Sequence, residues 1–159
     1  MSDKVRTTAC LIVPATTAEV PQIAALEKVC FSDPWSEAVL TESVGHPLYR
    51  FLAAMDGKTV LGYAGMFLTL PEAQIANIAV APEARRRGIG RRLLRELYRE
   101  AASAGAEVIF LEVREHNAAA ISLYEQEGFV KVGMRRNYYS NPTENAYLYQ
   151  RVIPRPSEA

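Results

Sequence analysis

Five arginines and two glycines lie between residues 82 and 92, directly before a strongly amphipathic stretch. Apolar residues recur there at helical spacing from Ile89 to Ala101, which predicts that a helix begins near Gly88. The first amides of a helix are unpaired and its dipole is positive at that end, so phosphate binds well there. Gly88 and Gly90 lack a Cβ and would let a ligand approach the backbone. The pattern indicates a phosphate site, with a solvated basic face as the alternative.

Glu112 and Tyr124 are the two side chains whose settings could support proton transfer. Glu112 interrupts a run of apolar residues between Ala106 and Val113. A carboxylate in such a strand must be paired, solvated at a rim, or held in an apolar setting that strengthens it as a general base. Tyr124 follows Asn117 by seven residues, about two helical turns, so both lie on one side of a helix. A tyrosine in a short helix is by default a core residue, and its catalytic role needs separate support.

Periodicity and turn chemistry predict the elements that must position these residues. Strands are predicted at residues 9–13, 49–55, 59–68, 74–80, 106–113, 130–138 and 146–152, and helices after residues 16, 36, 88 and 117. A capping box from Thr16 to Glu19 opens the first helix, and Ser36 caps the second. Asn117 caps the helix that carries Tyr124.

The order of these elements predicts the fold class. Asp56-Gly57 joins two strands as an antiparallel hairpin. A helix separates the strand ending at Val80 from the strand beginning at Ala106, so these two strands must be parallel. The arginine-glycine loop then lies at the carboxyl edge of a parallel pair, where open α/β sheets bind ligands. We expect an α/β fold, with a mixed antiparallel and parallel sheet flanked by helices in a single domain, and a strand at 106–113 that is covered on both faces.

Length and charge restrict the possible partners. The 159 residues suit one domain, and we expect an extension at 1–8, the domain itself at 9–153 and a loose tail at 154–159. The 18 basic residues balance 18 acidic ones, yet seven arginines lie between residues 85 and 99. A neutral chain with one basic patch favours a compact polyanionic ligand over nucleic acid.

Cysteine usage and hydropathy indicate the compartment. Cys10 and Cys30 have no companion cysteines and no histidine cluster, so we expect reduced, buried thiols and no metal site. The N-terminus lacks an apolar signal segment, and no stretch reaches the roughly 18 apolar residues of a membrane span. We expect a cytoplasmic protein without membrane contact, and predict no particular oligomeric state.

Several sequence blocks, in order, resemble the GNAT superfamily of acetyl-CoA-dependent N-acetyltransferases, and the resemblance extends from about Phe31 to Tyr149. The blocks are Asn77-Ile78-Ala79-Val80, Arg85-Arg86-Arg87-Gly88-Ile89-Gly90, Leu111-Glu112-Val113-Arg114 and Asn117-Ala118-Ala119-Ala120-Ile121-Ser122-Leu123-Tyr124. Two further blocks, Pro34-Trp35-Ser36 and Arg135-Arg136-Asn137-Tyr138-Tyr139, make the chain most similar to the bacterial ribosomal-protein alanine N-acetyltransferase (RimI) branch. The segment Glu144-Asn145-Ala146 departs from the acidic run often seen in that branch.

The resemblance implies roles for these residues. The pantetheine arm of acetyl-CoA would pair with the backbone of Ile78, Ala79 and Val80, and Asn117 would also contact the cosubstrate. Its pyrophosphate would be held by Arg86, Arg87, Gly88, Ile89, Gly90 and Arg91. Glu112 would be the general base, and Tyr124, beside the cosubstrate, the general acid. The acceptor cleft would be shaped by Trp35, Arg135, Tyr138 and Tyr139. From residue type alone, Trp35 is more often a core anchor.

The expected activity is acetylation of the α-amine of a protein N-terminus, with the alanine of a small-subunit ribosomal protein as the acceptor. The alternatives are acetylation of a small amine, such as an antibiotic or polyamine, and a non-catalytic acyl-CoA-binding module. The presence of both Glu112 and Tyr124 argues against the module. A covalent route through Cys10 or Cys30 is not expected, because neither belongs to a block that forms the site.

Overall fold

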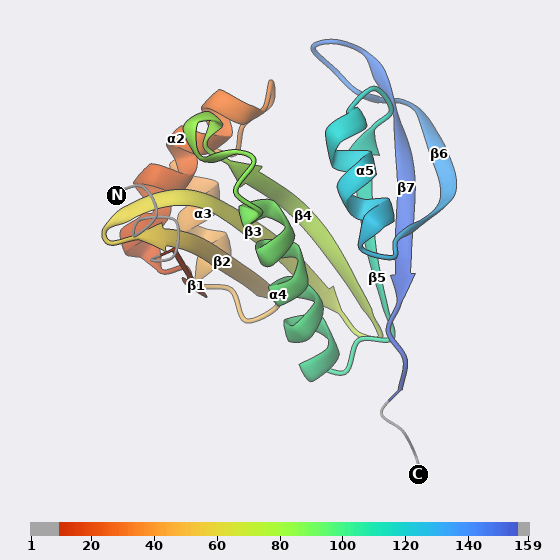
Figure 1. The fold of residues 1–159 in the computed structure, drawn as a ribbon, viewed down its shortest axis with the longest axis horizontal. Helices are drawn as coiled ribbons and strands as arrows, with labels where there is room; N and C mark the ends of the chain where they lie inside the picture. Colours follow the sequence, from red (N-terminus) through yellow and green to blue (C-terminus); the bar gives the residue numbers. More distant parts are fainter. Residues whose placement is uncertain (1–9, 156–159) are drawn as a thin grey trace.

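The computed structural model describes residues 10–155, which form a seven-stranded sheet with helices on both faces (Figure 1). The strands lie in the order β1-β2-β3-β4-β5-β7-β6. They are β1 (Leu11–Pro14), β2 (Tyr49–Asp56), β3 (Thr59–Thr69), β4 (Glu72–Val80), β5 (Val108–Arg114), β6 (Val130–Tyr139) and β7 (Glu144–Val152). The helices are α2 (Val20–Cys30), α3 (Glu37–Val44), α4 (Ile89–Ser103) and α5 (Ala118–Gln126), with 3-10 turns η1 (Thr17–Glu19) and η2 (Pro82–Ala84).

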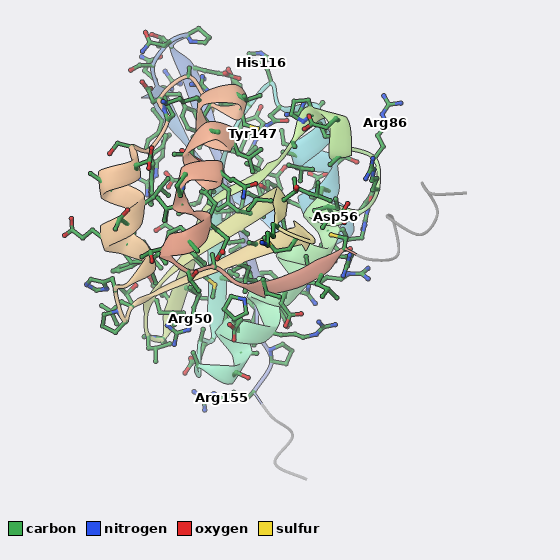
Figure 2. The ribbon with its side chains drawn as sticks, turned by 90° about the vertical axis from the view of Figure 1, so that its left-hand side faces the viewer. Arg50, Asp56, Arg86, His116, Tyr147 and Arg155 are labelled. Carbon is green, nitrogen blue, oxygen red and sulfur yellow. The ribbon has the colours of Figure 1, made fainter. Side chains whose placement is uncertain are left out.

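The expected fold class is confirmed. Neighbouring strands are antiparallel except for the pair β4 and β5, which is parallel as predicted. Helices α2 and α3 cover one face of β2 to β4, and α4 covers the other (Figures 1 and 2). The predicted extension at 1–8 and the tail beyond residue 155 lie outside the described residues. No helix within residues 10–155 has the length and apolar character needed to cross a membrane.

Local chemistry explains where the first elements begin. Thr16 and Glu19 form the predicted capping box, in which the Thr16 N–H donates to Glu19 Oε1 at 2.7 Å. Ser36 Oγ accepts from the Val39 N–H at 3.2 Å and starts α3. Gly57 adopts a φ of +60° in the turn between β2 and β3, a conformation that glycine adopts without strain. These caps and turns need no distant partner, which is why the sequence predicts them.

Helix α4 carries the longest apolar stripe. Its predicted inward residues are all buried, and they are Ile89, Leu93, Leu94, Leu97 and Ala101. They pack on β2, β3 and β4. Burying four large aliphatic side chains contributes roughly 1.5–3 kcal/mol each to folding, so this packing fixes the N-terminus of α4 at the end of β4.

Strands β4 and β5 separate soon after they begin. They pair over three residue positions, of which the last joins Gln74 and Phe110. Ala76 is then an extra residue in β4 relative to β3, which is a β-bulge that bends the strand. Strand β5 instead keeps β7 as its antiparallel neighbour along its whole length. The two strands therefore diverge from a common end (Figure 1).

The prediction that the strand at 106–113 is covered on both faces is wrong. Burial alternates along β5, so that Ile109, Leu111 and Val113 are buried while Phe110 and Glu112 are half-buried. Helix α5 lies over one face of β5 and β7 (Figure 1), and no helix within residues 10–155 covers their opposite face. The apolar run was misleading because Val108 and Phe110 are apolar although they share this half-buried face with Glu112.

Candidate active site

A cavity of about 670 Å³ opens where β4 and β5 separate. Its walls come from β4, β5 and α5, from the segment that joins α2 to α3, and from the connection between β6 and β7. Seven of the sixteen predicted site residues line it, namely Trp35, Ile78, Glu112, Asn117, Tyr124, Tyr138 and Tyr139, whereas the predicted phosphate ligands lie outside it. The tertiary structure thus brings together residues that are up to about a hundred positions apart in the chain.

Glu112 is a paired carboxylate that lines the cavity. Its side chain is 10% exposed, and Oε1 accepts from Gln74 Nε2 at 2.9 Å and more weakly from the Tyr138 hydroxyl at 3.3 Å. Arg135 Nε lies 2.8 Å from Oε2, an ion-pair distance, yet no hydrogen bond reaches this buried oxygen within residues 10–155. The carboxylate therefore has more acceptor capacity than its hydrogen bonds use, and a carboxylate on a cavity wall suits a general base.

Tyr124 lies on α5 with its ring in the core and its edge on the cavity. The residue is 9% exposed, and its ring centroid lies 6.0 Å from that of Phe129. Burial raises the pKa of the Tyr124 phenol to about 12, so the hydroxyl is protonated at neutral pH. No described side chain or backbone group bonds to that hydroxyl. The ring is a core residue, as residue type predicts, and the hydroxyl remains available to a ligand.

Asn117 orients the helix that carries Tyr124. Its Oδ1 accepts from the Ala120 N–H at 3.2 Å, which is the predicted N-cap. Gly128 ends the same segment with a φ of +89°, which is also as predicted. The helix is therefore set by its own terminal residues, and its first turn lines the cavity.

The edge of β4 that faces β5 has no strand partner beyond Gln74. Ile78, Ala79 and Val80 still pair with β3 on the other side, so alternate backbone groups of this stretch point toward the separated strand β5. The Val80 carbonyl is already an acceptor, from Arg85 Nε at 3.2 Å and from Cys30 Sγ at 3.7 Å. An open strand edge of this kind can bind an extended, amide-containing arm.

The N-terminus of α4 lacks a capping side chain. Gly88 is the N-cap residue with a φ of +75°, and the first helical bond runs from the Arg92 N–H to the Gly88 carbonyl at 3.0 Å. The amides of Ile89, Gly90 and Arg91 therefore precede the helical ladder and have no acceptor in it. A Cβ at Gly90 would lie at ordinary contact distance from Leu123 Cδ2, 3.6 Å. The positive φ at position 88 therefore favours glycine there. At position 90 the surroundings would admit a Cβ, so crowding does not require glycine.

The predicted phosphate ligands differ in how far they are already engaged. Arg91 donates to Glu127 Oε2 at 2.5 Å and to Gln126 Oε1 at 2.6 Å, so its guanidinium joins α4 to the end of α5. Arg95 and Arg91 together hold the pKa of the Glu127 carboxyl below its usual range. Arg87 makes one long contact, to the Glu83 carbonyl at 3.4 Å, and Arg86 projects from the surface (Figure 2). Arg86 and Arg87 are the cations best placed to meet a phosphate, and Arg91 would contribute its backbone amide.

Aromatic side chains line the part of the cavity formed by the α2–α3 connection and the end of β6. Trp35 is half-buried and makes edge contacts with Tyr49 and Phe51 at centroid distances of 6.5 and 6.3 Å, so it is both a core anchor and a cavity residue. Tyr138 is half exposed, and the Arg114 guanidinium lies 4.4 Å from the centre of the Tyr139 ring. Arg135 does not line the cavity and reaches it through its contact with Glu112.

Sequence reasoning missed Arg114, which spans the mouth of the cavity. It donates to Ser32 Oγ at 3.1 Å on one side, and to the Ser140 carbonyl at 2.9 Å and Glu144 Oε1 at 3.0 Å on the other. Arg114 lies two residues after Glu112, so alternation along a strand places both on one face, and that signal could have found it.

Two other cavity residues were also missed. Gln74, which bonds Glu112, needed the register of β4 against β5. Cys30 lines the cavity, whereas the sequence blocks had placed it outside the site. Within residues 10–155, no group of three His, Cys, Asp or Glu side chains is arranged to hold a metal ion.

Comparison with known proteins is consistent with this geometry. Residues 20–129, more than half of the chain, match the sequence model of the acetyltransferase (GNAT) family. The chain is 40% identical over 148 residues to N-alpha-acetyltransferase RimI of Mycobacterium tuberculosis, covering 89% of this chain and 92% of the relative. It is 39% identical over 123 residues to the ribosomal protein bS18-alanine N-acetyltransferase of Escherichia coli K12, covering 77% and 82%. The crystal structure of the ribosomal-protein-S18-alanine N-acetyltransferase from Escherichia coli superposes with a TM-score of 0.85 at 33% identity, covering 94% of this chain and 97% of that one.

Proposed function

Since this chain belongs to the acetyltransferase (GNAT) family, we propose that its cavity transfers the acetyl group of acetyl-CoA to the α-amine of a protein N-terminus. The enzyme is an acyltransferase, and the N-terminal alanine of a small-subunit ribosomal protein is the acceptor that its relatives' names suggest. One observation carries the proposal. Glu112, a carboxylate with unused acceptor capacity, and Tyr124, with a protonated hydroxyl, line the same cavity beside the edge of β4 that β5 leaves unpaired.

The chain's own residues fit acetyl-CoA. The free edge at Ile78, Ala79 and Val80 suits the two amides of the pantetheine arm, and the uncapped N-terminus of α4 suits the pyrophosphate. Arg86 and Arg87 lie beside that helix end, and Asn117 and Tyr124 line the cavity wall across from the strand edge. When bound, acetyl-CoA supplies the acetyl group as a thioester. We propose no metal in this chemistry.

Glu112 acts as the general base in this proposal. A protonated amine is not a nucleophile, so a proton must leave before the amine attacks the thioester carbonyl. An α-amine has a pKa of about 7.7–8.0 and is partly free at neutral pH, so one carboxylate that lines the cavity is sufficient. Arg135 remains 2.8 Å from Oε2 and holds the carboxylate in place.

Tyr124 assists departure of the thiol. Its pKa of about 12 exceeds that of a simple thiol, about 8.5, by about 3.5 units, so complete proton transfer to a thiolate would be uphill by about 5 kcal/mol. The phenol therefore stabilises the leaving sulfur by donating a hydrogen bond, and solvent completes the protonation. This refines the general-acid role that the resemblance implies.

The carboxylates of the cavity favour a protein acceptor over a polycationic amine. Three of them line it, Asp33, Glu112 and Glu144. Glu112 is paired with Arg135 and Glu144 with Arg114, so the wall presents little net negative charge to a polyamine or an aminoglycoside. The aromatic residues Trp35, Tyr138 and Tyr139 instead offer contacts for a peptide. We further propose that the enzyme works in the cytoplasm and takes no nucleic acid or membrane as a partner.

The acceptor assignment predicts a strong preference between two kinds of amine. At about pH 7.5, a peptide that begins with alanine should be acetylated at least about a hundredfold faster than the same peptide with a blocked N-terminus and one internal lysine. The pKa of the lysine amine is about 2.5 units higher, so a much smaller fraction of it is unprotonated and able to attack. Mass spectrometry of both peptides, with spermidine and an aminoglycoside as further acceptors, measures this. Equal rates on the two peptides would favour a lysine acceptor, and faster turnover of either small amine would favour the small-amine enzyme.

The cosubstrate assignment predicts that Gly88→Asp weakens acetyl-CoA binding by about tenfold or more, because a carboxylate would lie where the helix terminus attracts phosphate. Gly88→Asn is the matched control, since Asn and Asp tolerate positive φ similarly and only Asp adds charge. Titration calorimetry measures both variants. If the folded Asp variant binds as tightly as the Asn variant, the phosphates lie elsewhere.

A further inference from the structure

Glu27 is a fully buried carboxylate that neither the predicted mechanism nor the sequence blocks use. It lies one turn beyond Ile23 and Ala24 on the inward stripe of α2, and its exposed fraction is 0%. Burying a carboxylate is costly unless donors or a cation compensate for the lost water. No lysine or arginine within residues 10–155 lies at ion-pair distance from it.

Three hydrogen-bond donors take the place of water at this carboxylate. The Trp35 backbone N–H donates to Oε1 at 2.8 Å, Asn77 Nδ2 donates to Oε2 at 3.0 Å, and the Tyr63 hydroxyl donates to the same oxygen in a short bond. Burial is the main cause of a raised pKa at Glu27, and the three bonds oppose it. The three donors belong to separate segments, namely the α2–α3 connection, β4 and β3.

Two of these donors belong to opposite walls of the cavity. Trp35 lies in the α2–α3 connection on the acceptor side, and Asn77 lies in β4 directly before Ile78. Both residues line the cavity, whereas Glu27 does not. From outside the cavity lining, Glu27 therefore links the α2–α3 connection, which we assign to the acceptor, to β4, which we assign to acetyl-CoA.

The two walls differ in how firmly they are otherwise held. Asn77 is held by the antiparallel ladder between β4 and β3. Residues 31–36 belong to no helix or strand. Backbone hydrogen bonds hold only their two ends, from the Phe31 N–H to the Glu27 carbonyl and from the Leu40 N–H to the Ser36 carbonyl, and the Trp35 ring packs on Tyr49 and Phe51. Within the described residues, the other polar ties of this segment are Arg114 to Ser32, Asn141 to Asp33 and the Ser36 cap. Loss of the Glu27 bond would thus loosen the backbone at Trp35 and leave the strand in place.

We propose that Glu27 is a positioning residue that fixes residues 31–36 against β4 and so sets the affinity for the acceptor N-terminus. It touches neither substrate nor cosubstrate and acts through the Trp35 backbone. The proposal deepens the proposed function and rests on it.

The test separates binding of the acceptor from binding of acetyl-CoA. Glu27→Met keeps the length of the side chain and removes every acceptor, so the KM for an alanine peptide should rise about tenfold, as expected for loss of a buried hydrogen bond to a charged group. The Kd for acetyl-CoA should stay within about twofold, because the β4 ladder is untouched. Glu27→Gln retains an oxygen for the Trp35 N–H and should restore most of the peptide KM. Tyr63→Phe removes one bond to Glu27 without touching Trp35 and should leave both constants nearly unchanged.

A folded Glu27→Met protein with an unchanged peptide KM, or with acetyl-CoA binding weakened as much as peptide binding, would overturn the proposal. Wild-type hydrogen exchange tests it independently of that variant's folding. The Trp35 amide should exchange far more slowly than the amides of Ser32 and Asp33, and fast exchange would refute a fixed loop. Wild-type inactivity on every peptide would instead refute the proposed function, while the exchange of the Trp35 amide and the fluorescence of this single tryptophan would still report whether Glu27 holds the loop.

Discussion

Glu112→Gln should lower kcat/KM for an alanine peptide by about a hundredfold to ten-thousandfold near neutral pH, the usual contribution of a general base. The amide retains an oxygen that can accept from Gln74, but it has no carboxylate oxygen to take a proton. Arg135 is 57% exposed along its side chain and can turn to water, so the melting temperature should change little. Steady-state kinetics and thermal unfolding measure the two effects.

The pH dependence identifies the cause of that loss. In the wild type the rate should fall on the acidic side, because a protonated carboxyl cannot accept the ammonium proton. The Glu112→Gln enzyme should lose this acidic limb and keep a residual rate that rises with the free fraction of the amine. Glu107→Gln, directly before the same strand, is the matched control and should behave as the wild type. Near-normal turnover in a folded Glu112→Gln variant would transfer the base role to water or to Asp33, the remaining carboxylate of the cavity wall that no arginine pairs.

Tyr124→Phe should lower kcat by about a hundredfold, comparable to the loss of one donor that stabilises a developing negative charge. The phenylalanine ring keeps the contact with Phe129, and the hydroxyl has no bond to lose within the described residues. The free energy of unfolding should therefore change by no more than about 1 kcal/mol. Acetyl-CoA binding should be nearly unchanged, because the hydrogen bond to sulfur strengthens only as charge develops there.

The alkaline side of the rate profile tests the same assignment. Burial raises the pKa of Tyr124 to about 12, so the hydroxyl stays protonated and no fall in kcat is expected from it below about pH 10–11. Tyr147→Phe, a half-buried tyrosine of β7 outside the cavity lining, is the control. If Tyr124→Phe keeps full turnover, Tyr124 is a core residue only and the thiolate leaves without its help.

The two catalytic variants also separate the enzyme from an acyl-CoA-binding module. Both should bind acetyl-CoA normally and turn over slowly, whereas Gly88→Asp should bind it poorly. A wild-type protein that binds acetyl-CoA but acetylates no amine would support the module instead. The presence of a carboxylate and an unengaged phenol in the lining of one cavity argues for the enzyme.

The sequence by itself determined the elements whose signals span a few residues. Thr16 with Glu19, Ser36 and Asn117 cap their helices as predicted, and Asp56-Gly57 forms the predicted hairpin. A cap or a turn is satisfied by backbone groups within about four positions, so its chemistry is complete in the local sequence. The family resemblance also rested on such short blocks.

The tertiary structure alone decided the partners of charged and polar side chains. The guanidinium of Arg91, a residue expected at the pyrophosphate, binds Glu127, 36 residues away. Glu27 is buried because Trp35, Tyr63 and Asn77 meet behind the cavity. A helical pattern marks which face is apolar, but it does not specify which donor will reach a carboxylate from another strand.

The cavity itself also depends on long-range packing. Strand β7, last in the sequence, lies between β5 and β6 and pairs with β5 along its whole length, while the bulge at Ala76 bends β4. The parallel pairing was predictable, because a helix between two strands requires a crossover. The separation of the strands was not, since it results from competition between β4 and β7 for β5, and backbone hydrogen bonds between segments about forty residues apart leave no local pattern in the sequence.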